Sequence, residues 1–161
     1  MSDIVSRKSI QDMAPLIYEI VSSGGAVKLE VKGNSMMPVL RNERDAVLLK
    51  KAENISRFDV VLFKRANGKI ALHRIVEINN GTYTIIGDNQ YRFDKNIKNE
   101  DFIAKAVEFH RDDKRIGEES IRKFGAFWYW TYPLRNFIRR GFSWIKRHLP
   151  DCIRSLKNKF R

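Results

Sequence analysis

The stretch that decides the fold is residues 58–89, which have the sequence FDVVLFKRANGKIALHRIVEINNGTYTIIGDN. Its three apolar, β-rich runs are separated by Asn67-Gly68 and Asn80-Gly81, dipeptides that favour tight hairpin turns. Similar runs flank this stretch, and the full set of expected strands is 26–31, 46–49, 60–63, 70–77, 82–86 and 103–109. Because no long helical pattern lies between these runs, the sequence predicts a compact, mainly antiparallel β fold.

Helical periodicity is found only outside this β-rich part. Residues 10–22 carry apolar side chains at the spacing of one helical face, and Ser22-Ser23-Gly24-Gly25 ends the pattern. Beyond Gly117 the pattern is helical again over 118–130, and further amphipathic segments follow Pro133. We therefore expect an N-terminal helix (1–25), a β domain (26–115) and a helical tail (116–161).

The charge of the chain is concentrated in that tail. The net charge is +12, yet residues 114–161 hold 13 basic and 3 acidic residues, whereas residues 1–113 hold 18 and 16. Aromatic residues are interleaved with the cations: Phe124, Phe127, Trp128, Trp130, Tyr132, Phe137, Phe142 and Trp144. Such a tail suits an anionic membrane surface, but it equally suits helices that pack on the β domain. Nucleic acid is a third, less favoured partner, because no recognisable binding module accompanies the tail.

Several classes of protein are excluded by composition. A single cysteine, Cys152, cannot form an intramolecular disulfide or a thiolate zinc site. No run of 18 or more apolar residues is present, and residues 1–7 lead into no apolar segment, so we expect neither a transmembrane helix nor a signal peptide. These features favour a cytoplasmic protein without a metal or another cofactor.

Three short segments carry groups capable of chemistry. Ser35 follows a strand and Gly33, in a turn that can expose its hydroxyl. His73 lies in an expected strand and can accept a proton near neutral pH. Asp88 lies in a Gly-Asp-Asn turn. Taken singly, each has an ordinary structural explanation: a capped turn, a strand histidine and a turn aspartate.

Taken together and in this order, the segments resemble the superfamily of signal peptidase I and the self-cleaving repressor proteases. The matching elements are Gly33-x-Ser35-Met36-x-Pro38, Phe58-Asp59-Val60-Val61-Leu62-Phe63, His73-Arg74-Ile75 and Gly87-Asp88-Asn89, within about residues 29–109. Typical bacterial members have lysine where this chain has His73. The chain is therefore similar to the endoplasmic-reticulum and archaeal type, which has histidine at this position.

The resemblance implies a role for each residue. Ser35 would be the nucleophile, His73 the general base, and Asp88 would orient the imidazole. The backbone N–H of Ser35 would bind the oxyanion, and the residues around it that belong to the oxyanion or substrate site would be Gly33, Asn34 and Met36. Core packing is the alternative for Met36. Arg74 is expected to point away from His73 and pair with an acid, and Asp45 and Asp59 are expected to be structural.

These observations predict a serine endopeptidase that processes a precursor or exported peptide. Without an anchor or a DNA-binding domain, it resembles the small members of the superfamily, for which the family implies the chemistry but not the substrate. The cationic tail would place it at the inner face of the membrane. The alternative is a peptide- or membrane-binding module that keeps the fold without catalysis, because exposed edge strands can bind extended peptides.

Overall fold

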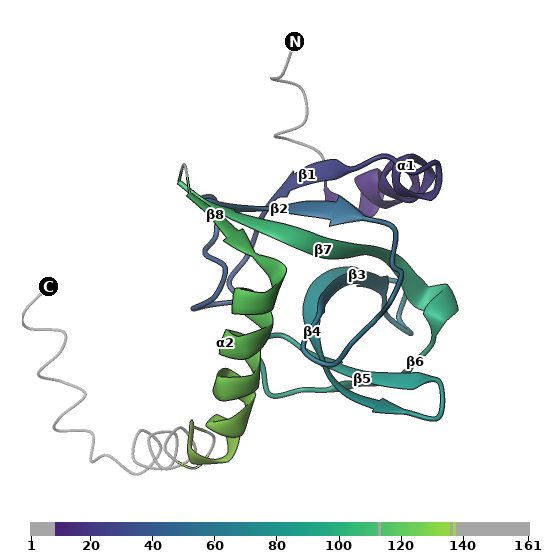
Figure 1. Ribbon diagram of the computed structural model, residues 1–161. Helices are drawn as coiled ribbons and strands as arrows, with labels where there is room; N and C mark the ends of the chain where they lie inside the picture. The colour runs from purple at the N-terminus through teal and green to yellow at the C-terminus, as the bar shows by residue number, and fades with distance from the viewer. Residues whose placement is uncertain (1–8, 113, 136, 138–161) are drawn as a thin grey trace, which may run out of the picture. The chain divides into compact units, whose positions relative to one another are not determined.

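The computed structural model describes residues 9–112, 114–135 and 137. Its elements, in chain order, are α1 (Ile10–Ser22), β1 (Val27–Glu30), β2 (Asp45–Lys50), β3 (Val60–Lys64), β4 (Ile70–Asn79), β5 (Thr82–Ile86), β6 (Asp94–Ile97), the 3₁₀ helix η2 (Asn99–Asp101), β7 (Phe102–Arg111), β8 (Lys114–Gly117) and α2 (Glu118–Trp130). The expected fold class, mainly antiparallel β with a helix on either side, is confirmed (Figure 1).

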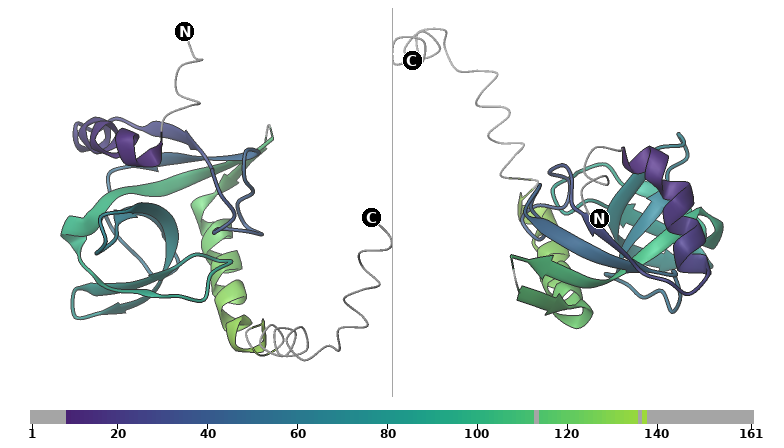
Figure 2. Two further views of the ribbon diagram at one scale, coloured as in Figure 1. Left: turned by 180° about the vertical axis from the view of Figure 1, so that it is seen from behind. Right: turned by 90° about the horizontal axis from the view of Figure 1, so that it is seen from above.

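All strands belong to one antiparallel sheet in the order β1-β2-β7-β3-β4-β5-β6, and β8 adds to β7. The long strand β7 links the two halves of this sheet. Its C-terminal part pairs with β2 and its N-terminal part with β3. Strands β3 to β6 curl beneath the layer of β1, β2 and β7 (Figure 1). The two helices lie on opposite sides of the strands (Figure 2).

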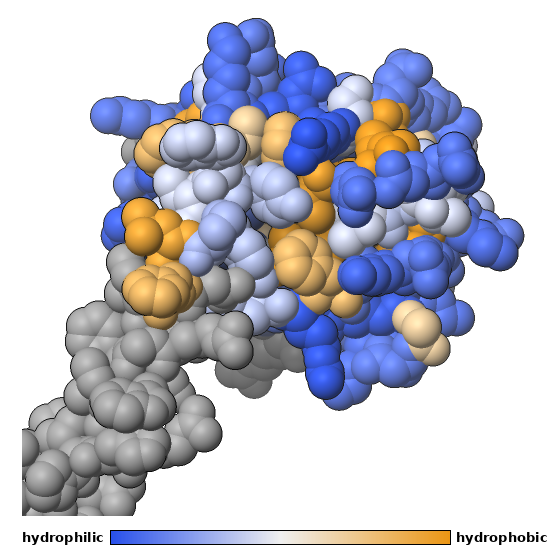
Figure 3. Space-filling model, turned by 90° about the horizontal axis from the view of Figure 1, so that it is seen from below, coloured by the Kyte–Doolittle hydropathy of each residue, from blue (hydrophilic) through white to orange (hydrophobic). Residues whose placement is uncertain are grey.

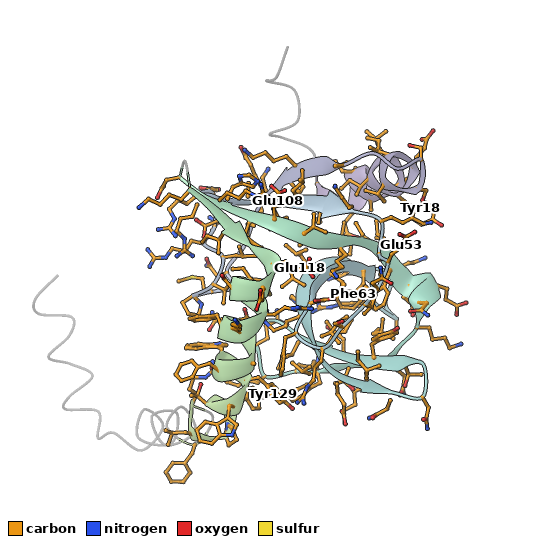
Figure 4. All side chains as sticks on the ribbon, in the orientation of Figure 1. Tyr18, Glu53, Phe63, Glu108, Glu118 and Tyr129 are labelled. Carbon is orange, nitrogen blue, oxygen red and sulfur yellow. The ribbon has the colours of Figure 1, made fainter. Side chains whose placement is uncertain are left out.

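Each half of the sheet has its own core. Around β1, β2 and β7, the buried side chains include Ile17 and Val21 of α1 together with Val47 and Phe109. Inside the curl of β3 to β6, a second cluster is built from Val61, Phe63, Ile75, Tyr83, Ile85, Ile97 and Phe102, and Phe63 points into this interior (Figure 4). Burying one large apolar side chain contributes about 1.5–3 kcal/mol, so the two clusters account for most of the driving force for folding.

The hairpins that define the fold form at the expected dipeptides. Asn80 and Gly81 both have positive φ, 46° and 76°, as a two-residue turn with the twist of a β-hairpin requires. At the other hairpin, Arg65 N–H donates to the carbonyl of Lys69 (2.8 Å) and closes a three-residue loop. Gly68, with φ +79°, takes the left-handed position of that loop. This loop fixes where Arg65 leaves β3.

Two strands, β6 and β8, are absent from the sequence prediction. Both are four residues long, DKNI and KRIG, and each pairs with a single neighbour. Polar side chains dominate both, so neither shows the alternation that identified the other strands. The missed strand β6 matters most, because it contributes a carboxylate to the candidate site described below.

The predicted helices at 10–22 and 118–130 are confirmed as α1 and α2. Contacts within the chain group the described residues up to Tyr129 into one compact unit, and Trp130 begins a second. The expected amphipathic segments beyond Phe137, including Phe142 and Trp144, lie outside the described residues. In the part of the chain that the structure describes, no helix is long and apolar enough to cross a membrane.

Candidate active site

Ser35 lies in the connection between β1 and β2, which is held from both ends. Gly33, at φ +89°, donates its N–H to Oδ1 of Asn42 (2.6 Å). Met36 is 1% exposed and packs in the first core, and its carbonyl accepts from Leu40 N–H (2.9 Å). The core packing expected for Met36 is what its burial shows, and its place beside a substrate stays a prediction. Its burial holds the adjacent Ser35 half-buried at the surface.

The turn after β5 contacts the backbone of Ser35. Asn89 N–H donates to the Ser35 carbonyl (2.8 Å), and the Asn89 side-chain amide donates to the Asn34 carbonyl (3.1 Å). Gly87 lies so close that a Cβ there would be 2.7 Å from the Ser35 carbonyl oxygen and 3.0 Å from Nε2 of His73. Glycine is therefore required where the three segments meet, and both the serine backbone and the imidazole border that point.

The His73 ring is 2% exposed and lies on β4, opposite Val61 of β3. Its two nitrogens have different surroundings. Nε2 faces Gly87, whereas Nδ1 lies 3.2 Å from Nη2 of Arg65 and 3.6 Å from Oδ2 of Asp94. Among the described residues, no hydrogen bond joins the Ser35 hydroxyl to His73.

The Asp88 carboxylate is paired with Arg74. It accepts two hydrogen bonds from Arg74, Nε to Oδ1 (2.8 Å) and Nη2 to Oδ2 (2.7 Å), and both residues are buried. The physical reason is the alternation along β4: His73 and Arg74 are consecutive, so they face opposite sides of the strand. The Asp88 side chain lies on the same side of β4 as Arg74, with which it is paired. The expectation that Arg74 pairs with an acid is confirmed, while the orienting role expected of Asp88 stays a prediction.

Asp94 takes the place that was expected of Asp88. It stands on β6 opposite Ile85 and presents Oδ2 to the Nδ1 side of the His73 ring. Sequence reasoning missed it because its strand was not recognised. An acidic residue beginning a short polar segment after Gly-Asp-Asn is too common a pattern to select it; the pairing of β6 with β5 is what brings it to the histidine.

Arg65, also absent from the sequence prediction, completes the cluster. Its Nε and Nη2 both lie 3.0 Å from Oδ2 of Asp94, and Nη2 lies 3.4 Å from Oε1 of Gln90. Burial raises the pKa of Asp94, but the contact with His73 and the charge of Arg65 outweigh this effect, and the pKa lies below its usual value. Asp94 is thus held as a carboxylate beside the ring.

The family model described as Peptidase S24-like matches residues 2–107. The chain belongs to this family. Comparison with curated proteins finds no significant match. Membership in the Peptidase S24-like family accounts for the fold and for the coarse class, a peptidase or a protein with a related fold, while the matched range contains Ser35, His73 and Asp94 and ends before α2.

The helix α2, which follows the Peptidase S24-like region, packs against the far side of the site. Arg74 Nη1 donates to the carbonyl of Ile121 (3.2 Å), and Trp128 Nε1 donates to the carbonyl of Asp88 (2.8 Å). A Cβ at Gly125 would lie 2.5 Å from Cζ of Arg74, so this glycine allows the helix to approach the guanidinium. Of the three interpretations of the tail, packing on the β domain therefore describes residues 118–129.

The N-terminus of α2 is fixed by a second buried cluster. Lys105 of β7 contacts Asp59 Oδ2 (3.0 Å) and Glu118 Oε1 (2.9 Å), and Glu118 is the first residue of the helix (Figure 4). Burial lowers the pKa of Lys105, but its bonds to Glu118 and Asp59 outweigh this effect and raise it. Asp59 is structural as expected, and so is Asp45, which is buried between Arg44 and Arg111.

Across residues 9–112 and 114–135, no group of three or more His, Cys, Asp or Glu side chains is arranged to hold a metal ion. The chemistry available at the site is that of a hydroxyl, an imidazole, a carboxylate and a guanidinium.

Proposed function

We propose that this Peptidase S24-like protein is a serine endopeptidase in which Ser35 is the nucleophile and His73 the general base. The observation that carries the proposal is the junction at Gly87, where Nε2 of His73 and the backbone of Ser35 border the same point. Ser35 and His73 come from separate segments that meet at Gly87, and Nε2 is the ring nitrogen on that side.

The chemistry would follow the general serine-peptidase scheme. Nε2 of His73 takes the proton of the Ser35 hydroxyl while Oγ attacks the peptide carbonyl, and the imidazolium then gives the proton to the leaving amine. The Ser35 backbone N–H is a candidate donor to the oxyanion. Asp94 stabilises the imidazolium from the Nδ1 side, the role that was expected of Asp88, whose carboxylate is paired with Arg74.

A serine-directed fluorophosphonate tests this function without a known substrate. The wild-type chain should be labelled at Ser35, and Ser35→Ala should lose the label. His73→Gln should slow labelling by about 10²–10⁴-fold, the usual contribution of a general base. His110→Gln, which changes another partly buried histidine on β7, is the matched control and should label at the wild-type rate. Equal labelling of the Ser35→Ala variant would contradict the proposal and favour the binding module without catalysis.

We also propose that the enzyme works at an anionic membrane surface, the inner face of the cytoplasmic membrane, on a precursor or exported peptide. On α2, Ile121 and Gly125 are buried, whereas Phe124 and Phe127 are 39% and 62% exposed. Exposed apolar side chains stand among hydrophilic ones on the face shown in Figure 3. In the sequence, these aromatic residues stand within the segment 114–161, which holds 13 basic and 3 acidic residues. Aromatic rings and cations together favour the headgroup region of anionic lipid.

Vesicle co-sedimentation of the full chain tests this location. The protein should bind vesicles of phosphatidylcholine with phosphatidylserine more tightly than pure phosphatidylcholine vesicles. Phe124→Ser/Phe127→Ser should weaken binding by at least about tenfold, because two rings no longer enter the interface. Leu16→Ser/Tyr18→Ser removes two comparably exposed apolar side chains from α1 and serves as the control. Binding that is unchanged by the α2 substitutions, or equal on both kinds of vesicle, would argue against a membrane role for this surface.

A further inference from the structure

The Nδ1 atom of His73 has two neighbours with opposite requirements. Arg65 Nη2 is 3.2 Å away, and Asp94 Oδ2 is 3.6 Å away. A guanidinium has donors only, so a bond from Arg65 needs an unprotonated Nδ1. A carboxylate accepts only, so a bond to Asp94 needs a protonated Nδ1. The neutral ring can satisfy one neighbour at a time.

The shorter contact is the one to Arg65, and it has a consequence at the other end of the ring. When Nδ1 accepts from Arg65, the single proton of the neutral imidazole is on Nε2. Nε2 faces Gly87 and the Ser35 segment. In this tautomer Nε2 is a donor and cannot take the Ser35 proton. The base proposed above is then present but carries its proton on the wrong nitrogen.

Arg65 can leave Nδ1 without losing its partners. Its Nη2 has two hydrogens for three acceptors: His73 Nδ1, Asp94 Oδ2 at 3.0 Å and Gln90 Oε1 at 3.4 Å. Gln90 belongs to the turn that borders Ser35, since its N–H donates to the Gly87 carbonyl (2.8 Å). The alternative acceptors are already in place, so a rotation of the guanidinium toward Asp94 and Gln90 frees Nδ1 at little cost.

We propose that Arg65 is a positioning residue that holds the resting His73 in the Nε2–H tautomer, and that the Ser35–His73 pair becomes competent when the guanidinium turns from Nδ1 to Asp94 and Gln90. One proton then leaves Nε2 for water and one arrives from water at Nδ1, where it faces Asp94, so the charge of the ring does not change. Because the turn that holds Gln90 contacts the Ser35 backbone, a peptide bound beside Ser35 would lie near this turn and would shift the balance. The proposal rests on the proposed function, because it takes His73 as the base.

Nitrogen NMR of the full-length protein reads the tautomer directly. With ¹⁵N-labelled histidine and a pH at which the ring is neutral, long-range ¹H–¹⁵N spectra distinguish a protonated from an unprotonated ring nitrogen. His73→Gln assigns the signal among the three histidines. The wild type should show Nε2–H. Arg65→Met, which removes the donor, should show Nδ1–H facing Asp94, and Arg65→Lys, which keeps a cation with donors, should retain Nε2–H.

The same variants are then labelled with the fluorophosphonate. Arg65→Met should label Ser35 at least about tenfold faster than wild type, the factor that corresponds to one hydrogen bond to a charged group. A wild-type ring that is already Nδ1–H, an Arg65→Met ring that stays Nε2–H, or a tautomer change with no change in rate would each overturn the proposal. Because the spectra need no activity, loss of labelling in every variant would count against the peptidase assignment alone, and the tautomer would still be read.

Discussion

Each side of β4 has an arginine paired with an aspartate, but one pair is buried and the other is partly exposed. On one side, Arg74 and Asp88 are buried and form a bidentate pair, and the remaining Arg74 donor reaches the carbonyls of Phe58 and Ile121. On the other side, Arg65 and Asp94 are partly exposed and share their hydrogen bonds with His73 and Gln90. The buried Arg74–Asp88 pair stabilises the fold and holds α2. The partly exposed Arg65–Asp94 pair shares its hydrogen bonds with His73, so Nδ1 of the ring can gain or lose a proton. Consecutive residues on one strand thus separate structure from chemistry.

The largest effect should come from breaking the buried ion pair between Arg74 and Asp88. Arg74→Met leaves the Asp88 carboxylate buried without its partner and should lower the free energy of unfolding by about 3–5 kcal/mol. Urea denaturation followed by circular dichroism measures this loss. Arg65→Met, on the other side of β4, is the matched comparison and should cost about 1 kcal/mol or less, because its ion pair is partly solvated. If both variants lose the same stability, the distinction between the two sides fails.

The next largest effect should be on the rate at which Ser35 is labelled, and it comes from Asp94 on the His73 side of β4. Asp94→Asn should slow fluorophosphonate labelling of Ser35 by about 10²-fold, because the imidazolium loses its carboxylate. Its thermal unfolding should stay close to that of wild type. Asp101→Asn, in the 3₁₀ helix that follows β6, replaces another acid of the same segment and should label normally. Wild-type labelling by Asp94→Asn would return the orienting role to another residue.

A smaller effect on stability is expected where α2 packs on Arg74 of the buried pair. Gly125→Ala would stabilise an exposed helix by about 1 kcal/mol, but here the new methyl group overlaps the Arg74 guanidinium. We expect a net loss of about 1–2 kcal/mol in the free energy of unfolding. Gly117→Ala, whose added Cβ would meet nothing within 4 Å, provides the control. A stabilised Gly125→Ala variant would show that α2 is not packed tightly on Arg74.

The smallest effect should be the pH dependence of the stability that Asp94 contributes. The Asp94 carboxyl has a lowered pKa in the folded protein, so its ionised form stabilises the fold above its unfolded pKa of about 3.9. This contribution is lost as the pH falls through the folded value. The stability difference between wild type and Asp94→Asn should therefore be present at neutral pH, about 1 kcal/mol or less, and vanish in acid. Urea titrations at several pH values measure it, with Glu30→Gln on the exposed side of β1 as the control for net charge. A stability difference that stays constant from neutral pH into acid would contradict this assignment.

The sequence contains enough information to place the histidine but not its partners. Asn80-Gly81 and the apolar runs on either side fix β4 and β5, and alternation along β4 puts His73 opposite to Arg74. The side on which Asp88 lies depends on the direction of one turn side chain, which local pattern does not encode. Asp94 depends on a polar edge strand, β6, that exists only because β5 offers it a partner.

The interpretation of α2 shows the same limit. Its amphipathic pattern is compatible with lipid and with protein, since both accept an apolar face. The decisive feature is Gly125, where the absence of a side chain admits Arg74. In the sequence, Gly125 is a single residue of low helix propensity within a helical pattern. Its contact with the buried Arg74 explains why glycine stands there. The exposed rings Phe124 and Phe127 on another part of the helix keep the membrane proposal open to experiment.

The glycine at position 87 offers a practical use. One added methyl group there would wedge between the carbonyl of Ser35 and Nε2 of His73 while leaving every reactive group chemically intact. Gly87→Ala would thus yield a protein whose hydroxyl and imidazole are both present yet held apart. On the proposed function, such a protein would retain a bound peptide without cutting it, and would serve as bait for recovering the substrate.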